Sequence, residues 1–206
     1  MVDLILFGDC RETLKQFPRG SAQMCVTSPP YYGLRDYGGE ENQIGMEQSP
    51  EDYVNEMVQV FREVRDVLKD DGVLWLNIGD SYYNYRSDGN YPKQSVSKTR
   101  QDLPQSTPVR GNKLKGLKGK DLIGIPWMLA FALRADGWYL RQDIIWHKPN
   151  PMPESVKDRC TKSHEYIFLL SKNQNYYYDN EAIKEPVKQD WGTRDRTKGK
   201  YHNPGT

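Results

Sequence analysis

Apolar residues occur along the chain both in short continuous runs and at helical spacing. The runs at residues 22–26 and 73–78 have strand length, and the second is typical of a central parallel strand covered on both faces. Between them, apolar side chains recur every three or four residues and predict an amphipathic helix: Val54, Met57, Val58, Phe61, Val64 and Leu68. Ser49 as N-cap and Pro50 in the first turn begin this helix, and Asp70-Asp71-Gly72 is expected to end it.

Shorter elements extend the same alternation. We predict a strand at Leu4–Phe7, helices at residues 11–17 and 125–136, strands at residues 138–146 and 165–170, and a hairpin partner for the last strand at Tyr176–Tyr178. The helix at residues 125–136 is apolar nearly all round, so we expect it to be deeply buried. Alternating strands and helices of these lengths predict an α/β fold.

A serine and two prolines stand at the end of the predicted strand at residues 22–26. Each proline fixes its own φ and restricts the residue before it, so the Ser28 hydroxyl and the Pro29 carbonyl are expected to lie side by side as acceptors. Paired acceptors pull the hydrogens of an exocyclic amino group out of the plane of its ring, which frees the nitrogen lone pair. Tyr31 or Tyr32 could stack on a base flipped out of a duplex. An ordinary extended surface turn is the alternative for so short a motif.

Several separated blocks of this sequence resemble the amino-group DNA methyltransferases of the permuted β arrangement, in the order of that family. They are FGDC at residues 7–10, TSPPYYGLRDYG at 27–38, VLWLNIGDS at 73–81, IWHKPNP at 145–151 and SHEYIF at 163–168. The resemblance implies a Rossmann-like sheet that binds S-adenosylmethionine and ends in antiparallel closing strands.

The resemblance also implies roles for particular residues. Ser28, Pro29, Pro30 and Tyr31 would hold the target amino group, and Asp9 would line the S-adenosylmethionine pocket. Asp80 would lie at the same end of the sheet, near the serine or the cofactor. Serine at the head of the motif favours cytosine N4 as the methylated atom, because relatives with aspartate there are more often adenine N6 enzymes.

The chain departs from the family pattern in one respect: it contains no Gly-x-Gly, although a Phe-x-Gly-x-Gly cofactor block normally follows in this arrangement. We therefore expect residues 1–182 to be an incomplete catalytic domain and residues 183–206 to begin a target-recognition region. Three explanations stay open. The chain is a fragment, a partner chain supplies the missing block, or the protein is inactive.

Residues 86–120 form a predicted long basic loop with nine cations against two anions, a net charge of +7 within a chain of net charge +1. A basic loop of this length can neutralise DNA phosphates, although a solvated insertion without a partner has the same composition. Double-stranded DNA is the expected partner, and we predict that it contacts Tyr32, Arg100, Arg110, Lys113, Lys115, Lys118 and Lys148.

Other features narrow the chemistry. Cys10, Cys25 and Cys160 have no metal-ligand spacing, and none follows a proline as the nucleophile of cytosine C5 enzymes does, so methylation at carbon is disfavoured. No membrane span or signal peptide is recognisable, which predicts a cytoplasmic protein. His147 and His164 are expected to have structural roles. Asn77, beside Asp80 at a strand end, is a stronger site candidate.

Two other classes of function stay open at this stage. One is amino methylation of RNA or of a protein glutamine, for which similar Pro-Pro-Tyr geometry would serve. The other is a non-catalytic DNA-binding remnant, or a subunit that needs a partner chain. The tyrosines at residues 82–85 could stack on bases or pack over the sheet edge.

Overall fold

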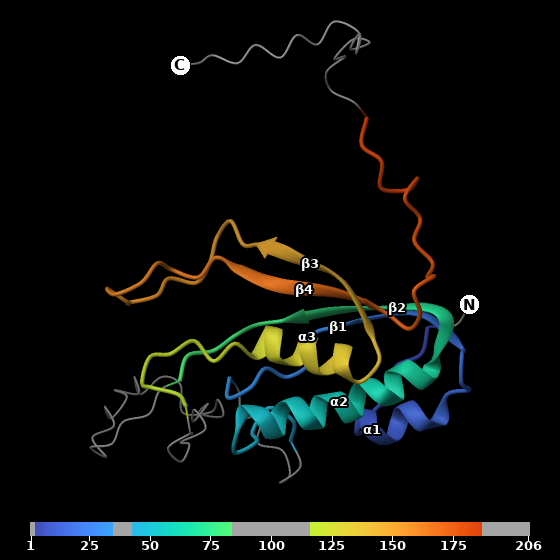
Figure 1. The fold of residues 1–206 in the computed structure, drawn as a ribbon, viewed down its shortest axis with the longest axis horizontal. Coiled ribbons are helices and arrows are strands. Elements are labelled where there is room, and N and C mark those ends of the chain that lie inside the picture. The colour runs from blue at the N-terminus through green and yellow to red at the C-terminus, as the bar shows by residue number, and fades with distance from the viewer. Residues whose placement is uncertain (1–2, 35–42, 84–115, 187–206) are drawn as a thin grey trace, which may run out of the picture.

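A four-stranded mixed sheet forms the centre of the molecule (Figure 1). The computed structural model describes residues 3–34, 43–83 and 116–186. Within them the strand order is β1-β2-β4-β3, with bounds β1 Ala22–Thr27, β2 Leu68–Ile78, β3 Tyr139–His147 and β4 His164–Ser171. β1 and β2 are parallel, whereas β4 is antiparallel to both β2 and β3. The predicted α/β fold with antiparallel closing strands is confirmed.

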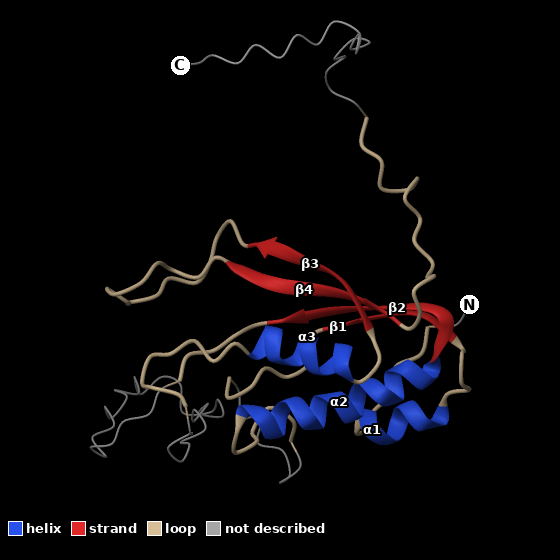
Figure 2. Ribbon diagram, in the orientation of Figure 1, coloured by secondary structure: helices blue, strands red, loops and turns tan. Residues whose placement is uncertain are grey.

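The helices lie together on one side of this sheet (Figure 2). They are α1 Cys10–Thr13, which continues as the 3-10 turn η1 Leu14–Gln16, α2 Pro50–Val67 and α3 Ile125–Ala135. α2 begins as predicted, because the Ser49 side chain accepts a hydrogen bond from the Asp52 N–H and Pro50 occupies the first turn. No helix in the described ranges combines the length and the apolar character needed to cross a bilayer.

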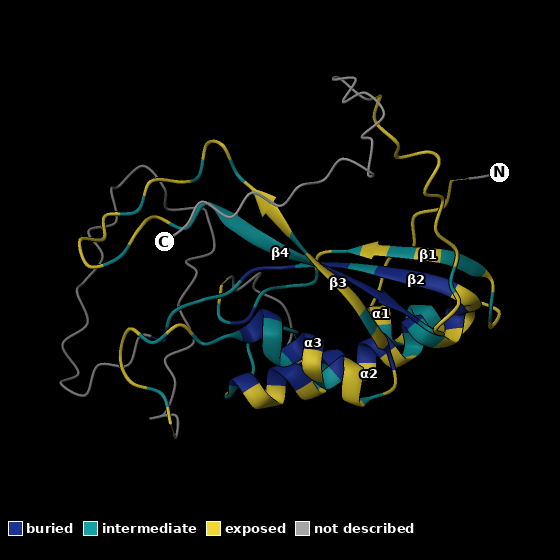
Figure 3. Cartoon of the chain, turned by 45° about the horizontal axis from the view of Figure 1, so that its top comes forward, coloured by how far each residue is buried: buried dark blue, intermediate teal, exposed yellow. Residues whose placement is uncertain are grey.

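The core lies between this helical layer and one face of β2 and β4. Leu74, Leu76 and Ile78 alternate along β2 and are fully buried, and Leu74 and Leu76 pair with the equally buried Leu170 and Phe168 of β4. Apolar side chains of α2 and α3 cover them: Tyr53, Met57, Phe61, Leu129 and Leu133. Figure 3 shows β2 as the buried centre of the sheet, with β3 largely exposed at the far edge.

The other face of the sheet differs from expectation. The apolar run of β2 predicts cover on both faces, but the described helices cover only one. Met24 and Val26 of β1 are 54% and 69% exposed, and they pair with Val73 and Trp75 of β2. This second face also carries Asn77, because side chains alternate along a strand.

Asp70-Asp71-Gly72 does not end α2 with a turn as predicted. The helix passes directly into β2 at Leu68, and the three residues lie within the strand. The pairing register shifts from Ala22↔Leu68 to Met24↔Val73, so β2 accommodates extra residues opposite β1 in a bulge. Asp70-Asp71-Gly72, a sequence that usually ends a helix, thus forms the irregular first part of β2.

Three further predictions were wrong. Leu4–Phe7 forms no strand, because no neighbouring described strand pairs with it, and Ile5 and Phe7 are 78% and 90% exposed. Tyr176–Tyr178 forms no hairpin with β4, whose two edges are already occupied by β2 and β3. α3 is only partly buried, since Phe131 is 46% exposed.

Candidate active site

The Ser-Pro-Pro segment leaves the carboxyl end of β1 and is fixed by contacts from distant parts of the chain. The Tyr53 hydroxyl, on α2, donates a 2.8 Å hydrogen bond to the Pro30 carbonyl. The Gly33 N–H donates to the Gly45 carbonyl at 2.8 Å, which closes the segment against a second loop. Ser28 itself is exposed. The turn therefore presents its serine to solvent while its proline backbone is held by the core.

Four polar side chains meet where β1, β2 and β4 come together. Ser28 Oγ lies 3.2 Å from Tyr31 Oη, which lies 2.9 Å from Asn77 Oδ1 and 3.1 Å from Glu165 Oε2. Asn77 and Glu165 share one face of the sheet, since Asn77 pairs with Ile167, two residues beyond Glu165. β4 begins where the parallel strands end, so the antiparallel strand delivers Glu165 to the same edge.

Lys148, in the loop after β3, forms an ion pair with the Glu165 carboxylate. Burial raises the pKa of Glu165, but the hydrogen bond and charge of Lys148, together with the Tyr31 hydroxyl, outweigh burial and lower the pKa overall. Glu165 is thus ionised at neutral pH. Burial, followed by the negative charge of Glu165, raises the pKa of Tyr31, although Ser28 opposes this shift, so the phenol keeps its proton.

Gly79, one residue past β2, allows Tyr31 to occupy its position. A Cβ at Gly79 would lie 2.6 Å from Tyr31 Cε2 and 2.9 Å from Cδ2, which are impossible contacts. Gly79, the first residue of the Gly-Asp pair after β2, therefore leaves the space that the Tyr31 ring occupies.

Asp80 connects the end of β2 to the start of α3. Its Oδ1 accepts hydrogen bonds from the N–H groups of Ser81, Gly124 and Ile125 at 2.9, 3.0 and 3.1 Å, and Oδ2 lies 3.1 Å from the Gly124 nitrogen. A carboxylate beside the first N–H groups of a helix stabilises that helix. Oδ2 retains acceptor capacity, so this oxygen suits a ribose hydroxyl or an ammonium group of a cofactor.

Asp9 is engaged differently. Its carboxylate accepts hydrogen bonds from the Arg11 backbone and guanidinium, at distances from 2.5 to 3.0 Å, and caps α1. The hydrogen bond from the Arg11 side chain lowers the pKa of Asp9. Arg11 also pairs with Glu56 of α2 at 2.5 Å, which ties α1 to α2. Each Asp9 oxygen accepts two hydrogen bonds from Arg11, whereas Asp80 Oδ2 accepts one, so Asp80 retains more acceptor capacity for a cofactor.

Tyr32 does not have the surface position that a base-stacking side chain needs. It is only 6% exposed, and its ring centroid lies 5.6 Å from that of Tyr53 in the core. Burial raises the pKa of Tyr32 to about 12. The ring fills the space between the turn and α2, which accounts for an aromatic residue directly after Tyr31.

Only Lys118 and Lys148 of the predicted DNA-contacting cations lie within the described residues. Arg100, Arg110, Lys113 and Lys115 lie outside the described residues, as does most of the predicted basic loop. Lys118 is 85% exposed at its side chain, 4.0 Å from Asp121. Lys148 forms an ion pair with Glu165, so that carboxylate offsets its charge.

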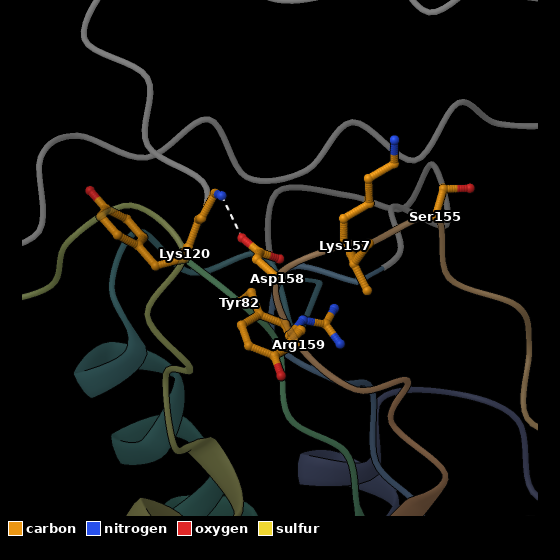
Figure 4. A pocket seen from close by; sticks show the side chains of 8 residues that line it. Tyr82, Lys120, Ser155, Lys157, Asp158 and Arg159 are labelled. Atoms are coloured by element: carbon orange, nitrogen blue, oxygen red, sulfur yellow. Dashed lines mark hydrogen bonds and ion pairs between the residues drawn. The ribbon is translucent and has the colours of Figure 1, made fainter.

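A cavity of about 1040 Å³ lies between the Tyr82 segment and the loop that connects β3 to β4 (Figure 4). Arg159 stacks over the Tyr82 ring at 4.0 Å and pairs with Glu154 at 2.6 Å. Lys120 pairs with Asp158 at 2.5 Å across the same space. The Arg159 guanidinium thus covers one face of the Tyr82 ring, which favours packing over base stacking for this tyrosine.

His147 and His164 face each other as a cross-strand pair of β3 and β4. The His164 ring makes an edge contact with Tyr166 at 5.4 Å. In the described part of the chain, no group of three or more His, Cys, Asp or Glu side chains could hold a metal ion, and the three cysteines are free thiols. The His164 ring thus packs beside Tyr166, whereas His147 is exposed at the end of β3.

Sequence reasoning named Asn77 but gave no role to Glu165 or Tyr53. Glu165 is the charged residue next to the apolar run at residues 166–170, and its position resembles that of Asn77 in β2. The pairing register that brings the two together could not be read from the sequence. Tyr53 is one apolar position among many along α2, and nothing in its spacing marks the hydrogen bond to Pro30.

A comparison with known families matches residues 22–205 to the model of the N6/N4 methyltransferases, described as DNA methylase. The chain belongs to this DNA methylase family. Among curated relatives, the Type II methyltransferase M.SmaI of Serratia marcescens is 55% identical over 183 residues, which are 89% of this chain and 60% of that protein. M.Cfr9I of Citrobacter freundii is 52% identical over 189 residues, 92% of this chain and 60% of the relative.

Solved structures agree on the fold of this methylase chain. The cytosine-N4-specific PvuII DNA methyltransferase gives a TM-score of 0.55 at 18% identity, over 84% of this chain and 50% of that one. A putative DNA modification methylase from Thermus thermophilus, complexed with S-adenosyl-L-methionine, gives 0.53 at 24% identity, over 85% and 55%. The fold is thus the Rossmann-like methyltransferase fold, and the chain spans about 60% of the length of the curated relatives it matches.

Proposed function

We propose that this chain carries the target-binding half of a DNA methyltransferase, which methylates the exocyclic amino group of a base flipped out of double-stranded DNA. The observation that carries the proposal is the exposed Ser28 hydroxyl at the end of β1, backed by Tyr31, Asn77 and Glu165. Membership of the DNA methylase family supports the same reading. Such an enzyme acts on DNA in the cytoplasm.

The chain's own residues orient the amine. Ser28 Oγ and the Pro29 carbonyl accept its hydrogens, so that the nitrogen lone pair points out of the base plane. Tyr31 stacks on the base, and the proline backbone holds the acceptors at fixed positions. Preorganised acceptors that exclude water supply the rate enhancement, without a covalent enzyme intermediate. The amine gains a methyl group and releases one proton to solvent.

S-adenosylmethionine supplies the methyl group from its sulfonium when it is bound. Asp80 Oδ2 is the best placed carboxylate oxygen for a hydrogen bond to this cofactor, and Asp9 is the second candidate. The remaining cofactor contacts, including a glycine-rich block, come from a further segment or from a partner chain in this proposal.

We propose cytosine N4 as the methylated atom, because serine heads the Pro-Pro-Tyr motif; adenine N6 is the alternative within the same family. The DNA strand contacts Lys118 and Lys148 together with Arg100, Arg110, Lys113 and Lys115.

The test is tritium transfer from labelled S-adenosylmethionine to duplex DNA, followed by mass spectrometry of the hydrolysed nucleosides. N4-methylcytosine supports the proposal, and N6-methyladenine selects the alternative. Ser28→Ala should abolish most transfer while DNA binding stays within about twofold, since one hydroxyl contributes little to an interface dominated by phosphate contacts. Unchanged turnover of Ser28→Ala would reject the assigned role of the serine.

Two other readings predict different results. An RNA or protein-glutamine methyltransferase would prefer those substrates over duplex DNA in the same transfer assay. A non-catalytic remnant, or a subunit that needs a partner, would show no binding of S-adenosylmethionine by this chain in calorimetry.

A further inference from the structure

The hydrogen bonds around Tyr31 have only one consistent direction. Asn77 Nδ2 lies 3.2 Å from the Tyr166 carbonyl, which can only accept, so the amide is oriented with Oδ1 toward Tyr31. Tyr31 Oη therefore faces two acceptors, Asn77 Oδ1 and the ionised Glu165 carboxylate. The phenol has one proton and must donate it to this side.

The direction at Tyr31 determines the direction at Ser28. With its proton committed, Tyr31 Oη meets Ser28 Oγ at 3.2 Å as an acceptor, so the serine donates to it. The serine hydroxyl has a single proton, and its lone pairs are then turned away from Tyr31. An exposed serine without such a partner can rotate and present its proton to the substrate instead.

We propose that Glu165 is a positioning residue, which acts through Tyr31 to keep Ser28 Oγ an acceptor toward the target amino group. This proposal rests on the proposed function and adds a residue to it. Lys148 holds the Glu165 carboxylate in place from the loop after β3. Glu165 does not touch the amine itself; together with Asn77 Oδ1 it holds the Tyr31 proton on its own side, so that the Tyr31 oxygen stays an acceptor for Ser28.

The neutral isostere Glu165→Gln tests this directly, because its side-chain NH2 can donate to the Tyr31 oxygen in place of Ser28 and so release the serine proton. We expect single-turnover methyl transfer to fall about 10- to 100-fold, the range for losing a hydrogen bond to a charged group, with cofactor affinity nearly unchanged and DNA bound no more weakly than by wild type. Tyr31→Phe should cause a similar loss, and the double variant little more than either single variant. If the losses of the two single variants multiply in the double variant, the two residues act independently and the proposal is overturned. A Glu165→Gln rate within about twofold of wild type would also overturn it.

Glu154→Gln is the matched control. Glu154 is also an ion-paired carboxylate in the loop that precedes β4, where it accepts hydrogen bonds from the Arg159 guanidinium and the Lys162 N–H. Its variant should transfer methyl groups at the wild-type rate. A comparable loss in Glu154→Gln would show that a general effect of charge, and not the hydroxyl chain, is responsible.

The pH profile reports on the ionised Glu165 carboxylate. The titratable and charged groups facing Glu165 are Lys148, Lys162 and Tyr31. Wild-type transfer should decline as the pH falls below 4.5 and Glu165 becomes protonated, and this decline should be absent from Glu165→Gln. The same acid limb in both proteins would contradict the proposal.

A second measurement does not depend on activity. NMR titration of protein labelled with ¹³Cζ-tyrosine, with the Tyr31 signal assigned by its loss in Tyr31→Phe, should show a lower Tyr31 pKa in Glu165→Gln and no change in Glu154→Gln. If wild type transfers no methyl group to any DNA, the proposed function fails, while this titration still decides the inference. An unchanged Tyr31 pKa in Glu165→Gln would overturn it.

Discussion

Gly79 and Tyr31 are in such close contact that a single added carbon at the glycine would lie 2.6 Å from the tyrosine ring. The glycine directly follows the central strand β2 and the tyrosine ends the Ser-Pro-Pro-Tyr motif, so the contact joins two separate blocks of the sequence. It positions the hydroxyl that Ser28, Asn77 and Glu165 share.

Gly79→Ala should displace the Tyr31 ring. We expect methyl transfer to fall about 100-fold, as for a displacement of about 1 Å at a reacting centre, and the free energy of unfolding to fall by about 1 to 3 kcal/mol from overpacking. Kinetics and urea denaturation measure the two effects. The double variant with Tyr31→Ala removes the clash, so it should be about as stable as Tyr31→Ala alone; a full additional loss would place the strain elsewhere.

Tyr53→Phe removes the hydroxyl that binds the Pro30 carbonyl and leaves that carbonyl without this partner. The free energy of unfolding should fall by about 1 kcal/mol, because the part-buried acceptor loses its hydrogen bond. Tyr139→Phe on β3, where the residue is 44% exposed, is the control and should change stability by less than about 0.5 kcal/mol. Equal effects of the two substitutions in urea denaturation would rule out a special role for the Tyr53 hydroxyl.

Asp80→Ala removes the carboxylate that caps α3. The free energy of unfolding should fall by about 0.5 to 2 kcal/mol, the usual cost of losing a cap. Ser49→Ala, which removes the cap of α2, should cost a similar amount. Only Asp80→Ala should also weaken S-adenosylmethionine binding in calorimetry. Equal cofactor affinity in both variants would restrict Asp80 to the role of a helix cap.

Stability should depend on pH through Glu165. Lys148 and Tyr31 outweigh the effect of burial, so the pKa of the folded protein lies below the ordinary value of 4.5. A lowered pKa means that the ionised carboxylate stabilises the fold above pH 4.5, and that this contribution is lost as the pH falls through the folded-state pKa. Unfolding free energies of wild type and Glu165→Gln should therefore converge on acidification. A constant gap between about pH 7 and pH 3 would contradict this coupling.

Much of the fold follows from local patterns, and the exceptions have identifiable causes. Ser49 and Pro50 start α2 where capping chemistry predicts it, because this signal involves only neighbouring residues. Asp70-Asp71-Gly72 also has a local signal, for a turn, but pairing with β1 converts it into a strand bulge. Leu4–Phe7 has strand composition without a described strand beside it.

The candidate site shows the same division. Ser28 and Tyr31 could be identified from their motif, and Asn77 from its position at a strand end. The partnership of Asn77 with Glu165 depends on the antiparallel register of β2 and β4, which no spacing in the sequence encodes. Tyr32 was misassigned because an aromatic residue next to a reactive motif looks the same whether it faces a ligand or the core.

The hydrogen bond from Tyr53 to Pro30 has a practical meaning for protein engineering. The segment from Thr27 to Leu34 does not by itself make the reactive turn, since its shape depends on a helix residue 23 positions downstream and on a glycine at the tip of the next strand. Transplanting the motif onto another scaffold would thus require three separate segments to be moved together. A loop graft alone would reproduce the amino-acid sequence of the turn but not its conformation.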